Sequence, residues 1–158
     1  MTQPISAERG ASVRFPPPLV FVGFIVLGII LRYVVGPLLP AAGWTRLLGA
    51  GLLLAGVAVI VSARTLFVRT GQHPAPWKPS PELILRGPYR FTRNPMYLGL
   101  TCIQAGLGLV TGNSWITVLA PVALLMVHFI AVRPEERYLT GKFGSSYRDY
   151  CHRVRRYI

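Results

Sequence analysis

Four long apolar stretches constrain the fold of this chain more than any other feature. They cover residues 19–35, 47–63, 95–111 and 115–132, and the last three of them contain no charged residue. In the first stretch, Arg32 stands near the end, where its long side chain can reach the membrane interface. A helix needs about 20 apolar residues to cross the hydrocarbon core, within a range of about 17 to 25. The sequence therefore predicts an all-α, polytopic membrane protein with four transmembrane helices.

Length and composition agree with a small membrane protein. The chain has 158 residues, which suits a single domain, and only 14% of them are charged. A soluble domain carries roughly 25% charged residues, because a small body must cover its surface with polar groups. Residues 1–18 form a polar, proline-rich tail before the first stretch, and no small-residue cleavage site follows it. We therefore expect a retained first span rather than a removed signal peptide.

The basic residues predict the orientation of the four spans. Lys and Arg number 17 against five Asp and Glu, a balance that could also indicate nucleic-acid binding. With four spans, however, fifteen of these bases lie on one side and only Arg32 and Arg46 on the other. Lys and Arg accumulate in cytoplasmic loops. We therefore expect both termini to be cytoplasmic and the protein to lie in the inner or plasma membrane. The bases would then face membrane lipid, with no nucleic-acid partner. The fifteen are Arg9, Arg14, Arg64, Arg69, Lys78, Arg86, Arg90, Arg93, Arg133, Arg137, Lys142, Arg148, Arg153, Arg155 and Arg156.

Glycines and cysteines inside the spans have structural explanations. The stretch GAGLLLAG, residues 49–56, loosely resembles a dinucleotide-binding loop, but no strand precedes it and it lies within an apolar span. Small residues at this spacing predict close packing between helices. Cys102 and Cys151 have no metal-ligand spacing to any histidine, so we expect no metal site.

The two polar segments that flank the last two spans carry the functional signal. Only residues 112–114 separate these spans, which predicts an antiparallel C-terminal helical hairpin. Asn94 and Pro95 suit a helix start, because Asn caps free N–H groups and Pro fits the first helical position. After the hairpin, Pro134 is expected to open a short cytoplasmic helix that Gly144 ends. The hairpin brings both segments to the same membrane depth.

The polar residues on these segments should converge on one patch at the membrane interface. Such a patch offers both acids and bases, so it can bind a zwitterion, and it can equally be a plain network of salt bridges. The residues concerned are Tyr89, Arg93, Asn94, Tyr97, Arg133, Glu135 and Glu136.

The two segments also resemble a known family. GPYRFTRNPMYLG, followed after the hairpin by EERYLTGKFGSSYRDYCHRV, is similar to the integral-membrane methyltransferases, which are the isoprenylcysteine carboxyl methyltransferases and their phospholipid N-methyltransferase relatives. The resemblance covers about residues 70–154 and implies S-adenosyl-L-methionine as cofactor, enclosed by residues 70–94 and 133–158. By position, the cofactor-binding residues would be Leu83, Ile84, Tyr89, Asn94, Pro95, Met96, Tyr97 and Glu135.

The resemblance implies the roles of individual residues. Leu83 and Ile84 would lie along the adenosine, and Glu135 would hold the cofactor's amino group. Glu136, which would share or brace that role, and Arg133 are the expected catalytic residues, although the family's substrate-side arginine falls at Ala131 here. Asn94 stands where the carboxyl methyltransferases usually have His, so this motif is more similar to the phospholipid-type relatives.

The expected function is S-adenosylmethionine-dependent methyl transfer at the cytoplasmic face. The acceptor would be lipophilic or membrane-borne and would present a carboxyl, thiol or amine group. The alternative is a non-catalytic membrane protein that binds lipid headgroups or acts in assembly.

Overall fold

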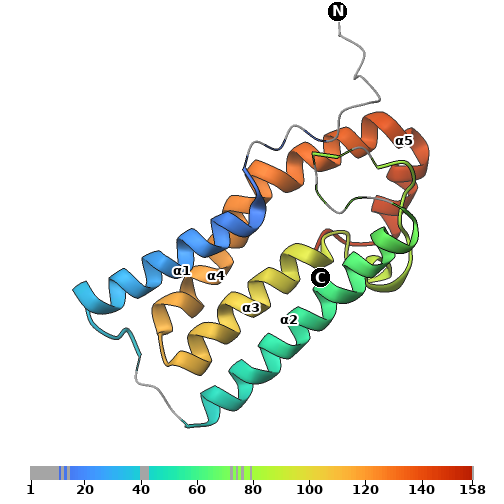
Figure 1. Ribbon diagram of the computed structural model, residues 1–158. Helices are drawn as coiled ribbons and strands as arrows, with labels where there is room; N and C mark the ends of the chain where they lie inside the picture. The colour runs from blue at the N-terminus through green and yellow to red at the C-terminus, as the bar shows by residue number, and fades with distance from the viewer. Residues whose placement is uncertain are drawn as a thin grey trace, which may run out of the picture.

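The protein forms an elongated bundle of helices with most of its loops gathered at one end (Figure 1). The computed structural model describes residues 11, 13, 15–39, 43–71, 73, 75, 77–78 and 80–157, and none of these forms a strand. The predicted all-α fold is therefore confirmed for this part of the chain. Arg9 and Arg14 of the predicted cytoplasmic tail lie outside the described residues. In chain order the elements are α1 (Pro17–Val34), α2 (Gly43–Arg69), the 3-10 helix η1 (Gly87–Arg90), α3 (Pro95–Thr111), α4 (Ser114–Val127), the π-helix η2 (His128–Val132) and α5 (Arg133–Arg153).

Three helices of the described chain are long and apolar enough to cross a membrane. They are α1, α2 and the continuous helix Ser114–Arg153, which comprises α4, η2 and α5. α3 is apolar but has only 17 residues, so its predicted span stays a prediction. α2 is longer than the predicted span 47–63. A hydropathy pattern identifies the apolar part of a helix and not the polar helical turns that continue beyond that part.

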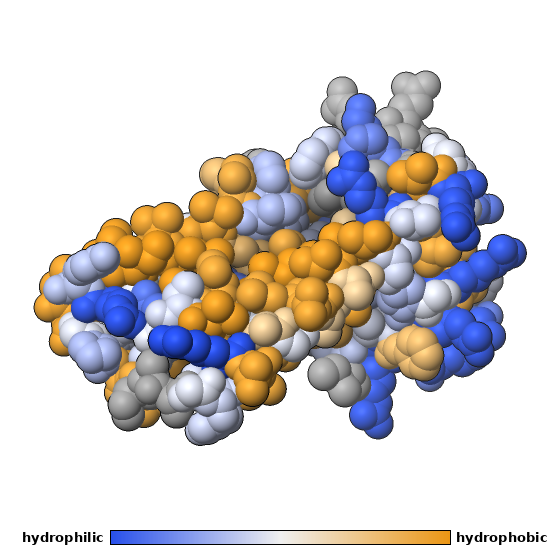
Figure 2. Space-filling view, turned by 60° about the horizontal axis from the view of Figure 1, so that its bottom comes forward, coloured by the Kyte–Doolittle hydropathy of each residue, from blue (hydrophilic) through white to orange (hydrophobic). Residues whose placement is uncertain are grey.

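The sides of the bundle are apolar and its ends are polar. Figure 2 shows hydrophobic side chains covering the body of the molecule, with hydrophilic side chains gathered at both ends. Large apolar side chains on the body stand out from it, including Leu47 at 79% exposed and Leu54 at 73% exposed. Such a surface suits lipid and not water.

Glycines allow α2 and α3 to pack at very short range. A Cβ atom on Gly56 would lie 2.6 Å from the carbonyl oxygen of Gly99, and one on Gly49 would lie 2.8 Å from that of Gly106. The backbones of the two helices are therefore in direct contact at two levels. This confirms the predicted packing role for Gly49 and Gly56, whereas a Cβ atom on Gly51 would meet nothing within 4 Å.

A two-residue turn joins α3 to α4 at the end of the bundle away from most loops. Gly112 has φ 65°, a left-handed conformation that favours glycine. The Asn113 side chain caps α4 by accepting from the N–H of Trp115 (3.2 Å), and it donates to the carbonyl of Gly28 on α1 (3.2 Å). Arg32 donates to the carbonyl of Gly112. These contacts fix α1 against the turn.

Pro134 stands in the first turn of α5 together with Glu135 and Glu136, as expected, but α5 is not a separate helix. The helix runs without interruption from α4 through η2 into α5, and the N–H of Arg133 donates to the carbonyl of His128, five residues earlier. A proline inside an α-helix clashes with the carbonyl four residues earlier, and a wider π turn is one way to accommodate it. The predicted break at Gly144 is confirmed, since its φ of 53° and ψ of −120° kink α5.

Candidate active site

A cavity of about 400 Å³ lies where α2 ends and α3 begins. α5 and the loop before η1 complete its walls, and Pro17 and Pro18 at the start of α1 form part of its rim. The volume lies within the range of small-molecule sites, about 300 to 1,000 Å³. The structure brings together around it nine of the ten residues expected in the site: Leu83, Ile84, Tyr89, Asn94, Pro95, Met96, Tyr97, Glu135 and Glu136.

Arg133 is the expected residue that does not line this cavity. Its side chain is exposed, and its guanidinium carbon lies 5.6 Å from the centre of the Phe129 ring. The reason is helical geometry: residues two apart on a helix point in nearly opposite directions, so Arg133 and Glu135 cannot face the same space. The expected convergence of polar residues therefore excludes Arg133.

Glu135 is half-buried, and the one polar contact of its carboxylate among the described residues comes from α3. The hydroxyl of Tyr97 donates to Oε1 of Glu135, and within the described part of the chain no cation pairs with this carboxylate. Burial raises the pKa of Glu135 from 4.5 to about 7; the bond from Tyr97 lowers it and the charge of Glu136 raises it. Such a group gains stability from a cationic ligand.

Glu136 has the opposite environment. Nε and Nη2 of Arg156 donate to its two oxygens, each at 2.8 Å. Nη1 of Arg93 lies 3.1 Å from Oε1 of the same carboxylate. Two guanidinium groups therefore compensate Glu136, while its neighbour Glu135 remains without a cation. Arg156 could not be predicted as a partner of Glu136, because it lies twenty residues away in the basic tail.

The predicted capping role of Asn94 is wrong. Its side chain makes no cap for α3; its Nδ2 instead donates to the carbonyl of Arg156 (3.0 Å). The backbone of Asn94, with φ −128° and ψ 52°, is also outside the usual geometry of a capping residue. The segment after α5 binds the Asn94 side-chain amide instead. Because the two residues are far apart in the sequence, local sequence signals could not predict this contact. Among the described residues, no side chain caps the first N–H groups of α3.

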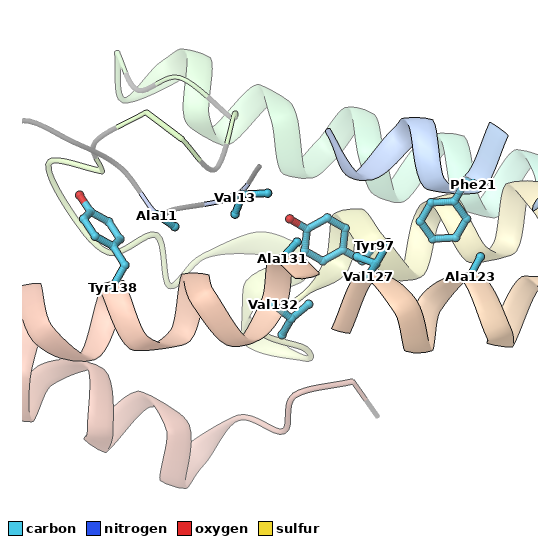
Figure 3. Close-up of a cluster of buried hydrophobic side chains, with 9 residues drawn as sticks. All are labelled: Ala11, Val13, Phe21, Tyr97, Ala123, Val127, Ala131, Val132 and Tyr138. Carbon is cyan, nitrogen blue, oxygen red and sulfur yellow. The ribbon is translucent and has the colours of Figure 1, made fainter. Parts of the chain in front are cut away.

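Tyrosines form much of the inner wall, and the sequence reading missed most of them. Tyr150 donates its hydroxyl to the carbonyl of Tyr89 (2.7 Å), and the Tyr89 ring meets Phe67 of α2 edge-on at 6.0 Å between centres. Figure 3 shows Tyr138 on α5 pointing toward the loop, where its hydroxyl accepts from the N–H of Ser80 (3.3 Å). Burial raises the pKa of Tyr89, and that of Tyr150 to about 12, so both hydroxyls stay protonated near neutral pH. The sequence feature that could have indicated these residues is a set of tyrosines on one polar helix.

Fold and site together define the class of protein: a helical protein with three helices long and apolar enough to cross a membrane and, at one end of its bundle, a largely apolar cavity that holds an acid pair. The model of the phospholipid methyltransferase family matches residues 44–146, which include α2, α3, α4 and the acid pair. The chain belongs to that family. An uncharacterized protein of Haemophilus influenzae is 38% identical over 65 residues, which are 40% of this chain and all of that protein. No solved structure matches the chain.

Proposed function

We propose that this protein transfers a methyl group from S-adenosylmethionine to a lipophilic or membrane-borne acceptor in this cavity, at the cytoplasmic face. One observation carries the proposal: the half-buried carboxylate of Glu135, which pairs with no described cation, lines the same cavity as the start of α3, which no described side chain caps. Membership of a methyltransferase family supports it.

The residues of the cavity fit the parts of this cofactor. Its methionine end is zwitterionic, with an ammonium that suits Glu135 and a carboxylate that suits free N–H groups. Met96 and Tyr97 lie in the first turn of α3, where backbone N–H groups have no acceptor within the helix and favour an anion. Leu83 and Ile84 offer an apolar surface to the adenosine. The charge pattern of the site thus complements the cofactor at both ends.

The cofactor supplies an activated methyl group on its sulfonium, so the protein needs no nucleophile of its own. Its residues bind, orient and exclude water. Tyr97 holds Glu135 in place, and Trp77 and Phe67 cover the cavity on the loop and α2 sides. Because both oxygens of Glu136 are bound by arginines, we assign it a bracing role rather than that of a base.

The acceptor has a plausible path from the bilayer. Pro17 and Pro18 at the start of α1 and Phe67 near the end of α2 lie on the cavity wall, and both helices expose apolar side chains along the body of the bundle. An acceptor with a hydrocarbon tail can keep that tail in lipid while its reactive group reaches the cavity. The reacting atom of a carboxylate or thiolate needs no further activation, whereas an amine must first lose a proton.

Labelling of membranes tests the proposal. Membranes that contain the protein are incubated with methyl-labelled S-adenosylmethionine, and the labelled lipid-phase species are identified by mass spectrometry. We expect labelling with the wild type and with Asp149→Asn, an exposed carboxylate on α5 outside the cavity, and its loss with Glu135→Gln. Absence of labelling, together with absence of cofactor binding by the purified wild type, contradicts the proposal and favours lipid-headgroup binding.

A further inference from the structure

The segment that follows α5, Val154–Tyr157, returns to the start of α3. Val154 is extended, with φ −125° and ψ 128°, so the chain leaves the helix there. The backbone N–H of Arg93 donates to the carbonyl of Arg155 (3.0 Å), and the Thr92 hydroxyl donates to the carbonyl of Arg156 (3.0 Å). Together with the bond from Asn94, three consecutive residues before α3 contact this segment, which we name the strap.

The strap also binds the acid pair and the π turn. The guanidinium of Arg156 makes a bidentate, charge-assisted contact with Glu136, at 2.8 Å for both bonds. That contact raises the pKa of Arg156, so the arginine is charged whenever the protein is folded. The hydroxyl of Tyr157 lies 2.9 Å from Nδ1 of His128, the first residue of η2. One short segment therefore connects the three parts that determine where Glu135 lies: α3, η2 and the first turn of α5.

The charges around Glu135 link the contacts of the strap to ligand binding. Glu135 is faced by Tyr97 from α3, Tyr89 from η1 and Tyr157 from the strap, none of which carries a charge near neutral pH, and by Glu136 on its own helix. An uncompensated charge on Glu136 would oppose ionisation of Glu135. Arg156 and Arg93 provide that compensation, and of the two only Arg156 binds both oxygens.

We propose that the strap positions the cofactor site and that Arg156 is its positioning residue, which acts through Glu136 to keep Glu135 available as a free carboxylate for a cationic ligand. The inference rests on the proposed function. The family model ends at residue 146, so the strap lies outside the part of the chain that the family comparison covers. Arg156 does not line the cavity, and its effect is therefore exerted through its neighbours.

Three variants test this role. Arg156→Gln removes the charge and the bidentate contact, Arg156→Lys keeps the charge alone, and Arg155→Gln removes a neighbouring charge whose side chain is exposed. The affinity for S-adenosylhomocysteine is measured by calorimetry from pH 6 to 7.5, together with the melting temperature. We expect Arg156→Gln to bind roughly tenfold more weakly, with the pH midpoint of binding moved upward. Arg156→Lys should restore the midpoint, and Arg155→Gln should resemble the wild type.

The outcomes separate this inference from the proposed function. Wild type that does not bind S-adenosylhomocysteine contradicts both. Wild type that binds, with Arg156→Gln showing the same affinity and midpoint, overturns the positioning role alone, and so does a fall in melting temperature without any change in binding. If Arg156→Gln does not fold, Arg156→Met, which keeps a long side chain without its charge, is measured in its place: weaker binding with a raised midpoint supports the role, and wild-type affinity with an unchanged midpoint refutes it.

Discussion

Replacement of Glu135 by glutamine tests the central assignment, because glutamine keeps the size of the side chain and removes its charge. In the structure Glu135 is half-buried, Tyr97 donates to one of its carboxylate oxygens, and no described cation compensates it. A hydrogen bond between this carboxylate and the ammonium of the cofactor is charge-assisted and contributes roughly 1.5 to 3 kcal/mol. Its loss should weaken binding by about 10- to 150-fold.

The raised pKa of Glu135 adds a dependence on pH. With a pKa of about 7, the carboxylate is mostly protonated at pH 6 and mostly ionised at pH 7.5. Because the ionised form binds the ammonium, wild-type affinity should rise about eightfold over that interval, and the rise should be absent in Glu135→Gln. Stability of the ligand-free protein follows the opposite trend. The folded state keeps a proton that the unfolded chain has lost, so the stabilisation is full below pH 4.5 and is lost as the pH rises through 7.

Calorimetry with S-adenosylhomocysteine measures these affinities without turnover, and thermal unfolding in the same detergent measures stability. Asp149→Asn is the matched control, since it removes an exposed carboxylate from the same helix. The wild type should lose more thermal stability between pH 5 and pH 8 than Glu135→Gln does. A well-folded Glu135→Gln that binds with wild-type affinity, or that keeps the pH dependence of the wild type, refutes the assignment.

Three further predictions follow from packing, geometry and charge. Gly56→Ala should destabilise the protein by roughly 1 to 3 kcal/mol in thermal unfolding, because its Cβ would press on the backbone of α3, whereas Gly51→Ala, which meets nothing within 4 Å, should not. Arg133→Ala should leave the affinity for S-adenosylhomocysteine within about twofold of wild type, because its guanidinium lies over Phe129 outside the cavity. A reporter fused after Gly112 should report the side opposite the cytoplasm; a cytoplasmic signal would contradict the orientation inferred from the basic residues.

Local signals predicted the helices well where two signals agreed. α3 begins at Pro95 and ends at Thr111, as expected from the apolar run 95–111 and from a proline at the first helical position. The helix α2 is longer than the predicted span 47–63, since it begins at Gly43 and continues to Arg69. Hydropathy marks the part of a helix that meets lipid, so it underestimates any helix that extends beyond the membrane.

The site residues could be predicted only where the residues of a motif are close together in the sequence. The Tyr89 to Tyr97 segment and the acid pair could be recognised as two motifs, and the turn between α3 and α4 places them together. Arg156 could not be found this way, since its contacts with Asn94 and Glu136 join segments 62 and 20 residues apart. The positive charge of Arg156 was already explained by its place in a basic tail, so it did not indicate a site residue. The position of Arg133, by contrast, followed from helical spacing to Glu135 and was available from the sequence.

The continuous helix from Ser114 to Arg153 explains how the acid pair is aimed. From Ser114 to the kink at Gly144 the helix has about 30 residues, which at 1.5 Å each give a length of about 45 Å; this exceeds the roughly 30 Å hydrocarbon core of a bilayer, so α5 projects beyond the apolar part. η2 fits an additional residue into the turn just before α5, and this turns the downstream side chains by about 100° relative to an unbroken α-helix. The direction in which Glu135 points therefore depends on the π turn that accommodates Pro134. Tyr157 of the strap contacts His128 at the start of that turn. The strap and Pro134 therefore both affect how the acid pair is rotated about the helix axis.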